Sequence, residues 1–159
     1  MLDSDGKIAE ISVEPETGNL KHIELFSQNL RFKCQRCAIF CCKLGGPRLS
    51  SKDVELLKKT GLTTAKFLDT ANGRIKSTVS GSCVFLKPDS QKQFYECTAY
   101  PYRPTLCRLY PFQIEKTSLH RFILTLLPCK GINRHLGAII DERFLIDNVL
   151  DLLLELCAR

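Results

Sequence analysis

Four cysteines within nine residues, Cys34-x2-Cys37-x3-Cys41-Cys42, are the side chains of this sequence whose type and spacing most directly predict chemistry. A C-x2-C pair lets the chain turn around one ion with both sulfurs about 2.3 Å from it. Neighbouring side chains tend to diverge, so Cys41 and Cys42 are expected to serve two metals or two corners of one cluster. The segment therefore predicts a metal site with thiolate ligands.

The remaining cysteines are widely spaced, and spacing alone would fit buried thiols equally well. Those that we add to the metal site are Cys83, Cys97, Cys107 and Cys129. Cys157 lies on the apolar stripe of a predicted helix and is interpreted as core packing. The three histidines, His22, His120 and His135, have no ligand-like spacing from the cysteines. An all-sulfur site follows, which suits Zn²⁺ or an iron–sulfur cluster.

The cellular compartment of the protein determines whether its cysteines are reduced thiols or disulfides. The first residues, MLDSDGKIAE, are acidic early and lack an apolar core, so we expect no secretory signal and a cytoplasmic protein. In a reducing cytosol, nine clustered cysteines are better explained by metal than by disulfides, which remain the alternative for a thermophilic source. The longest apolar stretches, 122–127 and 149–157, fall short of the roughly 20 residues that span a bilayer, so no membrane association is expected.

The formal charge of +6 counts every cysteine as a neutral thiol. Eight thiolates holding two divalent ions would add −4 and leave a net charge of about +2. Five cations stand directly beside cysteines, where they would favour the thiolate form: Lys33, Arg36, Lys43, Arg108 and Lys130. Much of the basicity is thus interpreted as internal compensation, and a nucleic-acid partner is not expected.

Four sequence blocks, RFKCQRCAIFCC, GSCVFL, ECTAYPYRPTLCRLYPF and LPCKGI, resemble the motifs of the YkgJ-type cysteine-cluster family, a zinc- or iron-chelating domain. The resemblance runs from about Phe32 to Ile132. It implies metal binding by Cys34, Cys37, Cys41, Cys42, Cys83, Cys97, Cys107 and Cys129, with Arg103, Pro104, Arg108 and Pro111 as motif companions. One departure concerns loop geometry, because Ala38 stands where the family often has glycine.

The same domain resembles part of flagellin lysine-N-methylase, a larger enzyme. Three classes of function are therefore weighed: a metal- or cluster-binding protein, which we favour; a methylase-related enzyme using S-adenosylmethionine; and a zinc-ribbon-like nucleic-acid binder. The chain has no Walker loop, G-x-G-x-x-G, H-E-x-x-H or G-x-S-x-G signature. Whether it is an enzyme, and which protein partner it has, stay open at this point.

Two further questions concern the site itself. Arg103 and Arg108 flank Cys107 and are interpreted as cofactor-binding residues that hydrogen-bond the ligands and balance their charge, the alternative being contact with an anionic substrate. For the metal, we favour an iron–sulfur cluster over two four-cysteine zinc sites, because all proposed ligands are sulfur and four are concentrated close together. The even division of eight thiolates into two tetrahedral sites supports zinc.

The elements that must position these residues are predicted from periodicity and turn signals. Residues 7–25 are expected to form a hairpin, and Ser50 or Ser51 to cap a helix over 53–60, followed by a short helix capped by Thr63 or Thr64. Strands are expected in CVFL, QFYEC and HRFILTLL, grouped in one small antiparallel sheet. From Asp141 onward, apolar residues recur at helical spacing.

These elements predict an α+β fold: a small single domain with short antiparallel strands, a helix pair and a C-terminal helix, organised around a cysteine-ligated metal site. Three segments are expected: an N-terminal β-hairpin extension over 1–30, the cysteine-cluster metal-binding domain over 31–132, and a C-terminal helix over 133–159 packed on that domain.

Overall fold

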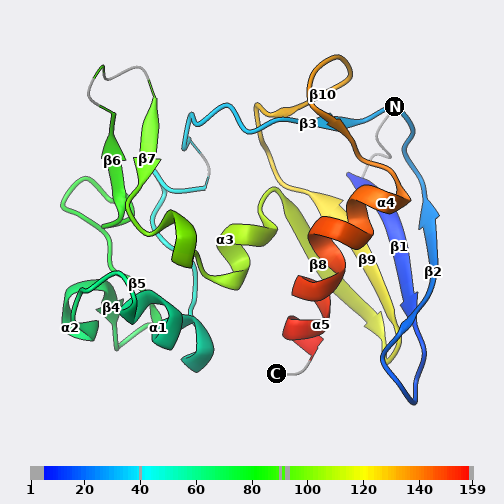
Figure 1. The fold of residues 1–159 in the computed structure, drawn as a ribbon, viewed down its shortest axis with the longest axis horizontal. Helices are drawn as coiled ribbons and strands as arrows, with labels where there is room; N and C mark the ends of the chain where they lie inside the picture. Colours follow the sequence, from blue (N-terminus) through cyan, green and yellow to red (C-terminus); the bar gives the residue numbers. More distant parts are fainter. Residues whose placement is uncertain (1–5, 40, 90, 92–93, 158–159) are drawn as a thin grey trace. The chain divides into compact units, whose positions relative to one another are not determined.

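The computed structural model describes residues 6–39, 41–89, 91 and 94–157 of the 159-residue chain. The chain divides into two compact units, which we call unit 1 (residues 1–35 and 109–159) and unit 2 (residues 36–108). These bounds differ from the three expected segments, because unit 1 joins both ends of the chain. Figure 1 traces the elements in chain order (Figure 1).

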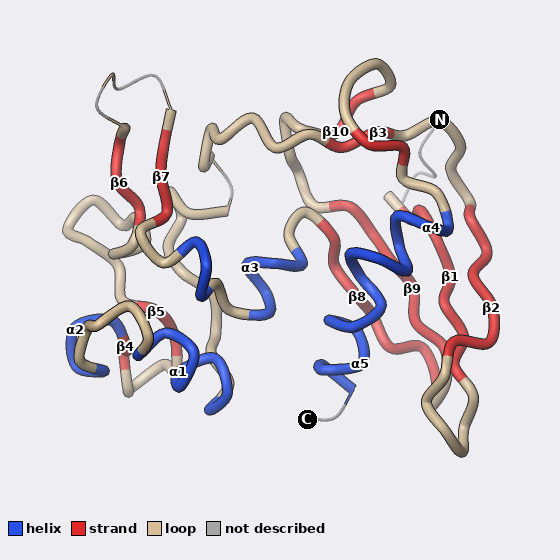
Figure 2. The backbone as a smooth tube through the Cα atoms, in the orientation of Figure 1, coloured by secondary structure: helices blue, strands red, loops and turns tan. Residues whose placement is uncertain are grey.

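Unit 1 is built on a four-stranded antiparallel sheet with the strand order β2-β1-β9-β8. Its strands, drawn in red in Figure 2, are β1 (Lys7–Val13), β2 (Leu20–Leu25), β8 (Phe112–Ser118) and β9 (Arg121–Leu126). The predicted hairpin over 7–25 is confirmed, since β1 and β2 pair antiparallel. Strand β8 was not predicted, and it joins the sheet through β9.

The predicted C-terminal helix is confirmed, and it packs on the sheet of unit 1, whose strands include the N-terminal hairpin. It begins at α4 (Glu142–Leu145), where the Asp141 side chain accepts a hydrogen bond from Phe144 N at 2.8 Å, and ends with α5 (Asp151–Cys157). A π-helical turn at Ile146–Leu150 lies between them. The core joins both elements, and its fully buried side chains include Leu124 from β9 and Leu153 from α5. Burial of this apolar face stabilises unit 1.

A second sheet in unit 1 places β3 (Arg31–Phe32) between β10 (Ile132–Asn133) and β11 (Ala138–Ile139). Two glycines permit this close approach. A Cβ at Gly131 would lie 2.5 Å from the Lys33 carbonyl oxygen, and one at Gly137 would lie 2.2 Å from that of Phe32. Any side chain at either position would push the backbone segments apart.

Unit 2 consists of short elements. They are α1 (Ser51–Lys58), α2 (Thr64–Phe67), β4 (Leu68–Asp69), β5 (Arg74–Ile75), β6 (Leu86–Pro88), β7 (Tyr95–Cys97), a 3₁₀ turn (Tyr100–Tyr102) and α3 (Thr105–Leu109, whose last residue belongs to unit 1). Phe67 and Phe85 lie at the centre of its core, with ring centroids 5.9 Å apart. The predicted helix pair is confirmed, with Ser50 as the cap of α1.

The prediction of one small sheet from CVFL, QFYEC and HRFILTLL is wrong. Of CVFL, only the last residue belongs to a strand, β6, which pairs with β7 from QFYEC. Strand β9 from HRFILTLL instead pairs with β1 and β8. The three segments have similar strand propensity, and their pairing depends on residues distant in sequence. The fold class is α+β with short antiparallel strands, as expected. Among the described residues, the structure contains no helix with the length and apolar character needed to cross a membrane.

Candidate metal centre

The part of the dense cysteine segment that lies in unit 2, from Arg36 onward, forms an irregular loop that is folded back by Ala38. This residue is buried and has φ +55°, in the left-handed region that favours glycine. Its carbonyl oxygen accepts hydrogen bonds from Cys42 N at 3.3 Å and Lys43 N at 2.9 Å. The turn thereby brings Cys41 and Cys42 back toward Cys37. The glycine that the family often has here fits this backbone, and alanine adopts it at some cost.

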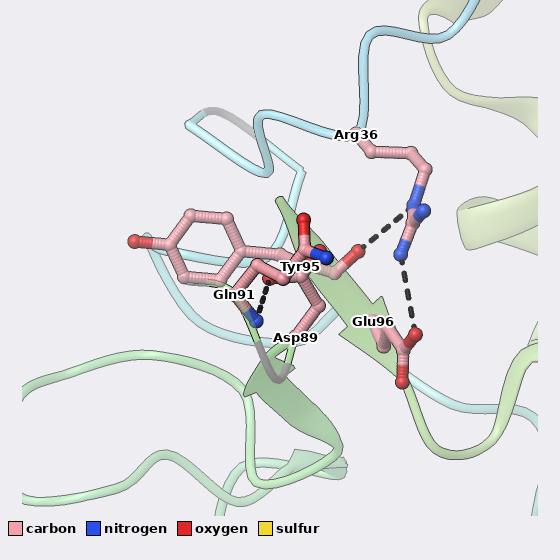
Figure 3. A network of polar contacts seen from close by, with 5 residues as sticks. All are labelled: Arg36, Asp89, Gln91, Tyr95 and Glu96. Atoms are coloured by element: carbon pink, nitrogen blue, oxygen red, sulfur yellow. Dashed lines mark hydrogen bonds and ion pairs between the residues drawn. The ribbon is translucent and has the colours of Figure 1, made fainter. Parts of the chain in front are cut away.

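Arg36 attaches this loop to β7, as Figure 3 shows (Figure 3). Its carbonyl oxygen accepts from Tyr95 N at 3.2 Å, and its Nε donates to the Tyr95 carbonyl oxygen at 3.2 Å. The guanidinium also lies 3.4 Å from Glu96 Oε1 and 5.6 Å from the centroid of Phe94. The ion pair is solvent-exposed and contributes little by itself. The backbone contacts place the loop beside the strand that carries Cys97.

Cys83 connects the same loop to the hairpin of β6 and β7. Its amide donates to the Cys42 carbonyl oxygen at 2.9 Å, and its side chain is buried in the core around Phe85. Across the hairpin, Leu86 is paired with Cys97, which packs on the same core. Cys42, Cys83 and Cys97, which are separated by up to 55 positions in the sequence, thus meet in one apolar cluster of unit 2.

Cys107 is carried by α3, and the buried carboxylate of Asp53 fixes the start of that helix. Asp53 Oδ1 accepts from both Thr105 N and Thr105 Oγ1 at 3.0 Å, while Oδ2 accepts from Ser50 N at 3.0 Å. Burial would raise the pKa of the Asp53 carboxyl, but the hydrogen bonds from Ser50 and Thr105 outweigh it and hold the pKa below its ordinary value. The carboxylate therefore joins the N-termini of α1 and α3.

The electrostatics show that five thiols of unit 2 influence one another: Cys41, Cys42, Cys83, Cys97 and Cys107. Burial raises the pKa of Cys83 and Cys97, and it raises the pKa of Cys107 to about 12, with further contributions from the charges of neighbouring thiols. A hydrogen bond between the adjacent thiols lowers the pKa of Cys41 to about 7 and raises that of Cys42. The adjacent side chains therefore converge, which differs from the divergence expected from the sequence.

The charge of Arg103 acts on three of these thiols. It favours the thiolate form of Cys41, Cys97 and Cys107, and at Cys97 and Cys107 it opposes the larger effect of burial, which raises the pKa. Its guanidinium lies 3.7 Å from the ring centroid of Tyr100, and its Nε donates to the Tyr100 carbonyl oxygen at 3.2 Å. These contacts hold the charge in place beside the cluster.

The cations adjacent to cysteines in sequence have other contacts. Arg36 binds β7, Lys43 Nζ lies 4.3 Å from the centroid of the Tyr95 ring, and Arg108 Nη2 donates to Thr105 Oγ1 at 3.4 Å. Successive side chains of a loop or helix point in different directions, so adjacency in sequence does not by itself place a cation at a thiol. Arg103, four residues before Cys107 and already predicted to balance the charge of the ligands, acts on the thiols.

The other two predicted ligands, Cys34 and Cys129, belong to unit 1. Lys33 N donates to the Gly131 carbonyl oxygen at 3.0 Å, which extends the alignment of β3 with β10 and brings the two cysteine-bearing segments side by side. Cys129 Sγ accepts from Gly131 N at 3.3 Å. The backbone of Cys157 lies in α5, and its side chain lies outside the part of the chain that is described.

Within the described residues, no three histidine, cysteine, aspartate or glutamate side chains are arranged as a ready-made metal site. The thiols of unit 2 are gathered but not in coordination geometry. Their chemistry nevertheless suits zinc or iron, because the donors are all sulfur.

Comparison with known proteins identifies related sequences. Residues 33–127, more than half of the chain, match the family described as "Putative zinc- or iron-chelating domain", named CxxCxxCC. The match contains seven of the eight predicted ligands and leaves out Cys129. Uncharacterized protein MJ0661 of Methanocaldococcus jannaschii is 28% identical over 137 residues, which cover 76% of this chain and 69% of that protein. No solved structure matches.

Proposed function

Because this chain belongs to the family of zinc- or iron-chelating cysteine-cluster domains, we propose that its metal is bound in unit 2 by thiolates drawn from Cys41, Cys42, Cys83, Cys97 and Cys107, with Cys37 from the same loop. The observation that carries the proposal is that Cys42, Cys83 and Cys97 meet in one apolar cluster, while the charges of Cys41, Cys83 and Cys97 also act on Cys107 in α3. Binding of a common metal would explain why thiols from the loop, the hairpin and α3 lie close together.

The charge of unit 2 supports this assignment. Residues 36–108 contain 13 lysines and arginines against 5 aspartates and glutamates, a formal charge of +8. If all six cysteines of the unit ionised, the charge would still be about +2 before any metal is counted. The unit can therefore hold several thiolates without net repulsion, and Arg103 supplies compensation at the cluster itself.

Two forms of the metal are supported by different features. An iron–sulfur cluster, favoured by the sequence, suits the all-sulfur donor set. A zinc ion suits the contact of Cys41 with Cys42, because two sulfurs on one tetrahedral ion lie about 3.8 Å apart, which is also a hydrogen-bonding distance for thiols. Cys34 and Cys129 complete the proposed eight-cysteine set as a separate pair in unit 1.

Anaerobic purification with elemental analysis and absorption spectroscopy tests the proposal. Protein with an iron–sulfur cluster would absorb broadly near about 400 nm and bleach on reduction, whereas zinc protein would be colourless because Zn²⁺ has a filled d shell. In either form, Cys83→Ser and Cys107→Ser should lose metal, whereas Cys157→Ser should retain it. Full metal content in both cluster variants would refute the ligand assignment.

The proposal concerns a binding activity. Arg103 and Arg108 are assigned to supporting roles at the metal centre, Arg103 through its charge and Arg108 through its hydrogen bond to Thr105. The methylase-related alternative would require saturable binding of S-adenosylmethionine, which calorimetry measures directly on the metal-loaded protein.

A further inference from the structure

Unit 1 contains a cavity of about 530 Å³ at the turn end of its four-stranded sheet, within the size range of small-molecule sites. It involves none of the cysteines. Most of its surface is apolar, including Val13 and Pro15, and its polar lining side chains carry hydrogen-bond donors with no carboxylate among them: Ser12, Lys21, His22, Ser118, His120 and Arg121.

The strand register explains why these side chains converge. Ser12 in β1 is directly opposite His22 in β2 and Arg121 in β9, and Ser118 in β8 is opposite Arg121. Directly opposite residues share one face of an antiparallel sheet, so the four form a row across all four strands. Ser12 is small and lies between two longer side chains, which leaves a depression with a hydroxyl at its floor.

A bulge in β2 and the turn between β8 and β9 place two further side chains, Lys21 and His120, beside this row. The pairing of β1 with β2 shifts between Ser12↔His22 and Val13↔Leu20. Lys21 is therefore left as the extra residue of a bulge. Bulges re-aim side chains, and Lys21 lines the cavity instead of alternating to the opposite face. His120 lies in the turn between β8 and β9, where its carbonyl oxygen accepts from Val13 N at 3.0 Å.

The next row along the sheet has the opposite charge. It runs Glu24, Glu10, Ile123 and Glu115 across the same four strands. The nearest link between the rows is an exposed contact of Arg121 Nη1 with Glu10 Oε1 at 3.9 Å, which is long for an ion pair and is screened by solvent. The row of Glu24, Glu10 and Glu115 repels anions, so an anion is attracted only to the row of His22, Ser12, Arg121 and Ser118.

We propose that this cavity binds a small oxyanion of the phosphate class, either inorganic phosphate or a phosphate monoester. Arg121 and Lys21 supply permanent positive charge, and the hydroxyls of Ser12 and Ser118 supply neutral donors for the remaining oxygens. The volume of the cavity exceeds that of one phosphate, so it has room for an organic group of modest size. The site is independent of the proposed metal centre.

Titration of the metal-loaded full chain with inorganic phosphate, followed by amide NMR at low ionic strength, tests this proposal. We expect saturable shifts confined to residues around 12, 21–22 and 118–121, and at least tenfold weaker binding in Arg121→Gln. Lys116→Gln removes the same charge from exposed β8 outside the cavity and serves as the matched control, with affinity unchanged. Glu10→Gln should tighten binding, because it removes the competing carboxylate.

A parallel titration with glycerol 3-phosphate distinguishes the two sources. Tighter binding of the monoester than of inorganic phosphate would assign the cavity to esters, and the reverse order would assign it to the free ion; either result supports the class. The proposal is overturned if Arg121→Gln and Lys116→Gln weaken binding equally. It is also overturned if the shifts appear mainly in unit 2, which is the more basic unit and the expected place of nonspecific attraction.

Discussion

The two units of this chain are stabilised in different ways. Among the described residues, the core of unit 1 has fifteen buried apolar residues, whereas that of unit 2 has six, one of them Cys83. Their charges also differ, at −2 for unit 1 and +8 for unit 2. A unit of 73 residues with short elements and a small core gains little from apolar burial alone. If metal is bound as proposed, we expect unit 2 to depend on it for stability and unit 1 to depend mainly on its apolar core.

The largest effect is expected from metal removal. Metal binding by thiolate sites contributes about 10 kcal/mol or more, comparable to the stability of a whole domain. After anaerobic chelation, amide hydrogen exchange should lose protection in α1, β6 and β7 and keep it in β1 and β9. Equal loss of protection in both units would show that they fold as one, and the comparison would fail.

Leu153→Ala tests the apolar side of the comparison. Leu153 is fully buried between helix and sheet, and truncation of such a residue costs about 2–5 kcal/mol. Denaturant unfolding should show this loss for unit 1, while metal content stays at the parental level. If the variant lost metal while unit 1 unfolded as in the parent, the idea that Leu153 stabilises unit 1 and not the metal centre would be contradicted.

Asp53→Asn should weaken unit 2 by about 1–3 kcal/mol, because the amide cannot accept from both Thr105 donors and Ser50 N while its own NH₂ group is buried. Since the pKa of Asp53 is lowered by folding, the carboxylate stabilises the fold above the ordinary carboxyl pKa of about 4. That contribution is lost as the pH falls through the lower folded value.

The pH dependence provides the control for this variant. Parent and Asp53→Asn should differ most near neutral pH and converge in acid, when measured by thermal unfolding. A difference that does not change with pH would mean that the effect of the substitution is steric and not electrostatic. Glu55→Gln, on the exposed face of α1, is the matched substitution and should change stability little.

Arg103→Ala should weaken metal binding by about 10–100-fold, as expected for a residue that supports ligands without touching the metal. Arg103→Lys should retain part of the affinity, because it keeps the charge and loses the planar donor contact with Tyr100. Competition with a chromophoric chelator measures both. Parental affinity in Arg103→Ala would remove this residue from the metal centre.

The smallest effect is expected at Ala38. Relief of left-handed strain in Ala38→Gly, about 1–2 kcal/mol, is largely offset by glycine's greater unfolded entropy and by the lost buried methyl group. Stability should therefore stay within about 1 kcal/mol of the parent. Ala38→Val should be clearly less stable, because a β-branched side chain tolerates this backbone poorly. Thermal unfolding in which valine equals glycine would mean that the loop adopts another conformation.

Local signals in the sequence determined several elements of this protein. The hairpin of β1 and β2, the Ser50 cap of α1 and the helix from Asp141 each depend on residues close together in the chain, and all three were predicted. The cysteine spacing likewise indicated the family that the comparison shows. Propensities, caps and periodicity act over one or two turns, so one sequence suffices to read them.

Tertiary structure alone decided the rest. It joined β9 to β1 and β8, aligned the segments that carry Cys34 and Cys129 within unit 1, and linked Asp53 to Thr105 across 52 positions. It also placed the charge of Arg103, predicted from the sequence as a balancing cation, where it acts on thiols from three different segments. These contacts join residues far apart in the chain, and their free energy exists only after the backbone has brought them together, which no local pattern encodes.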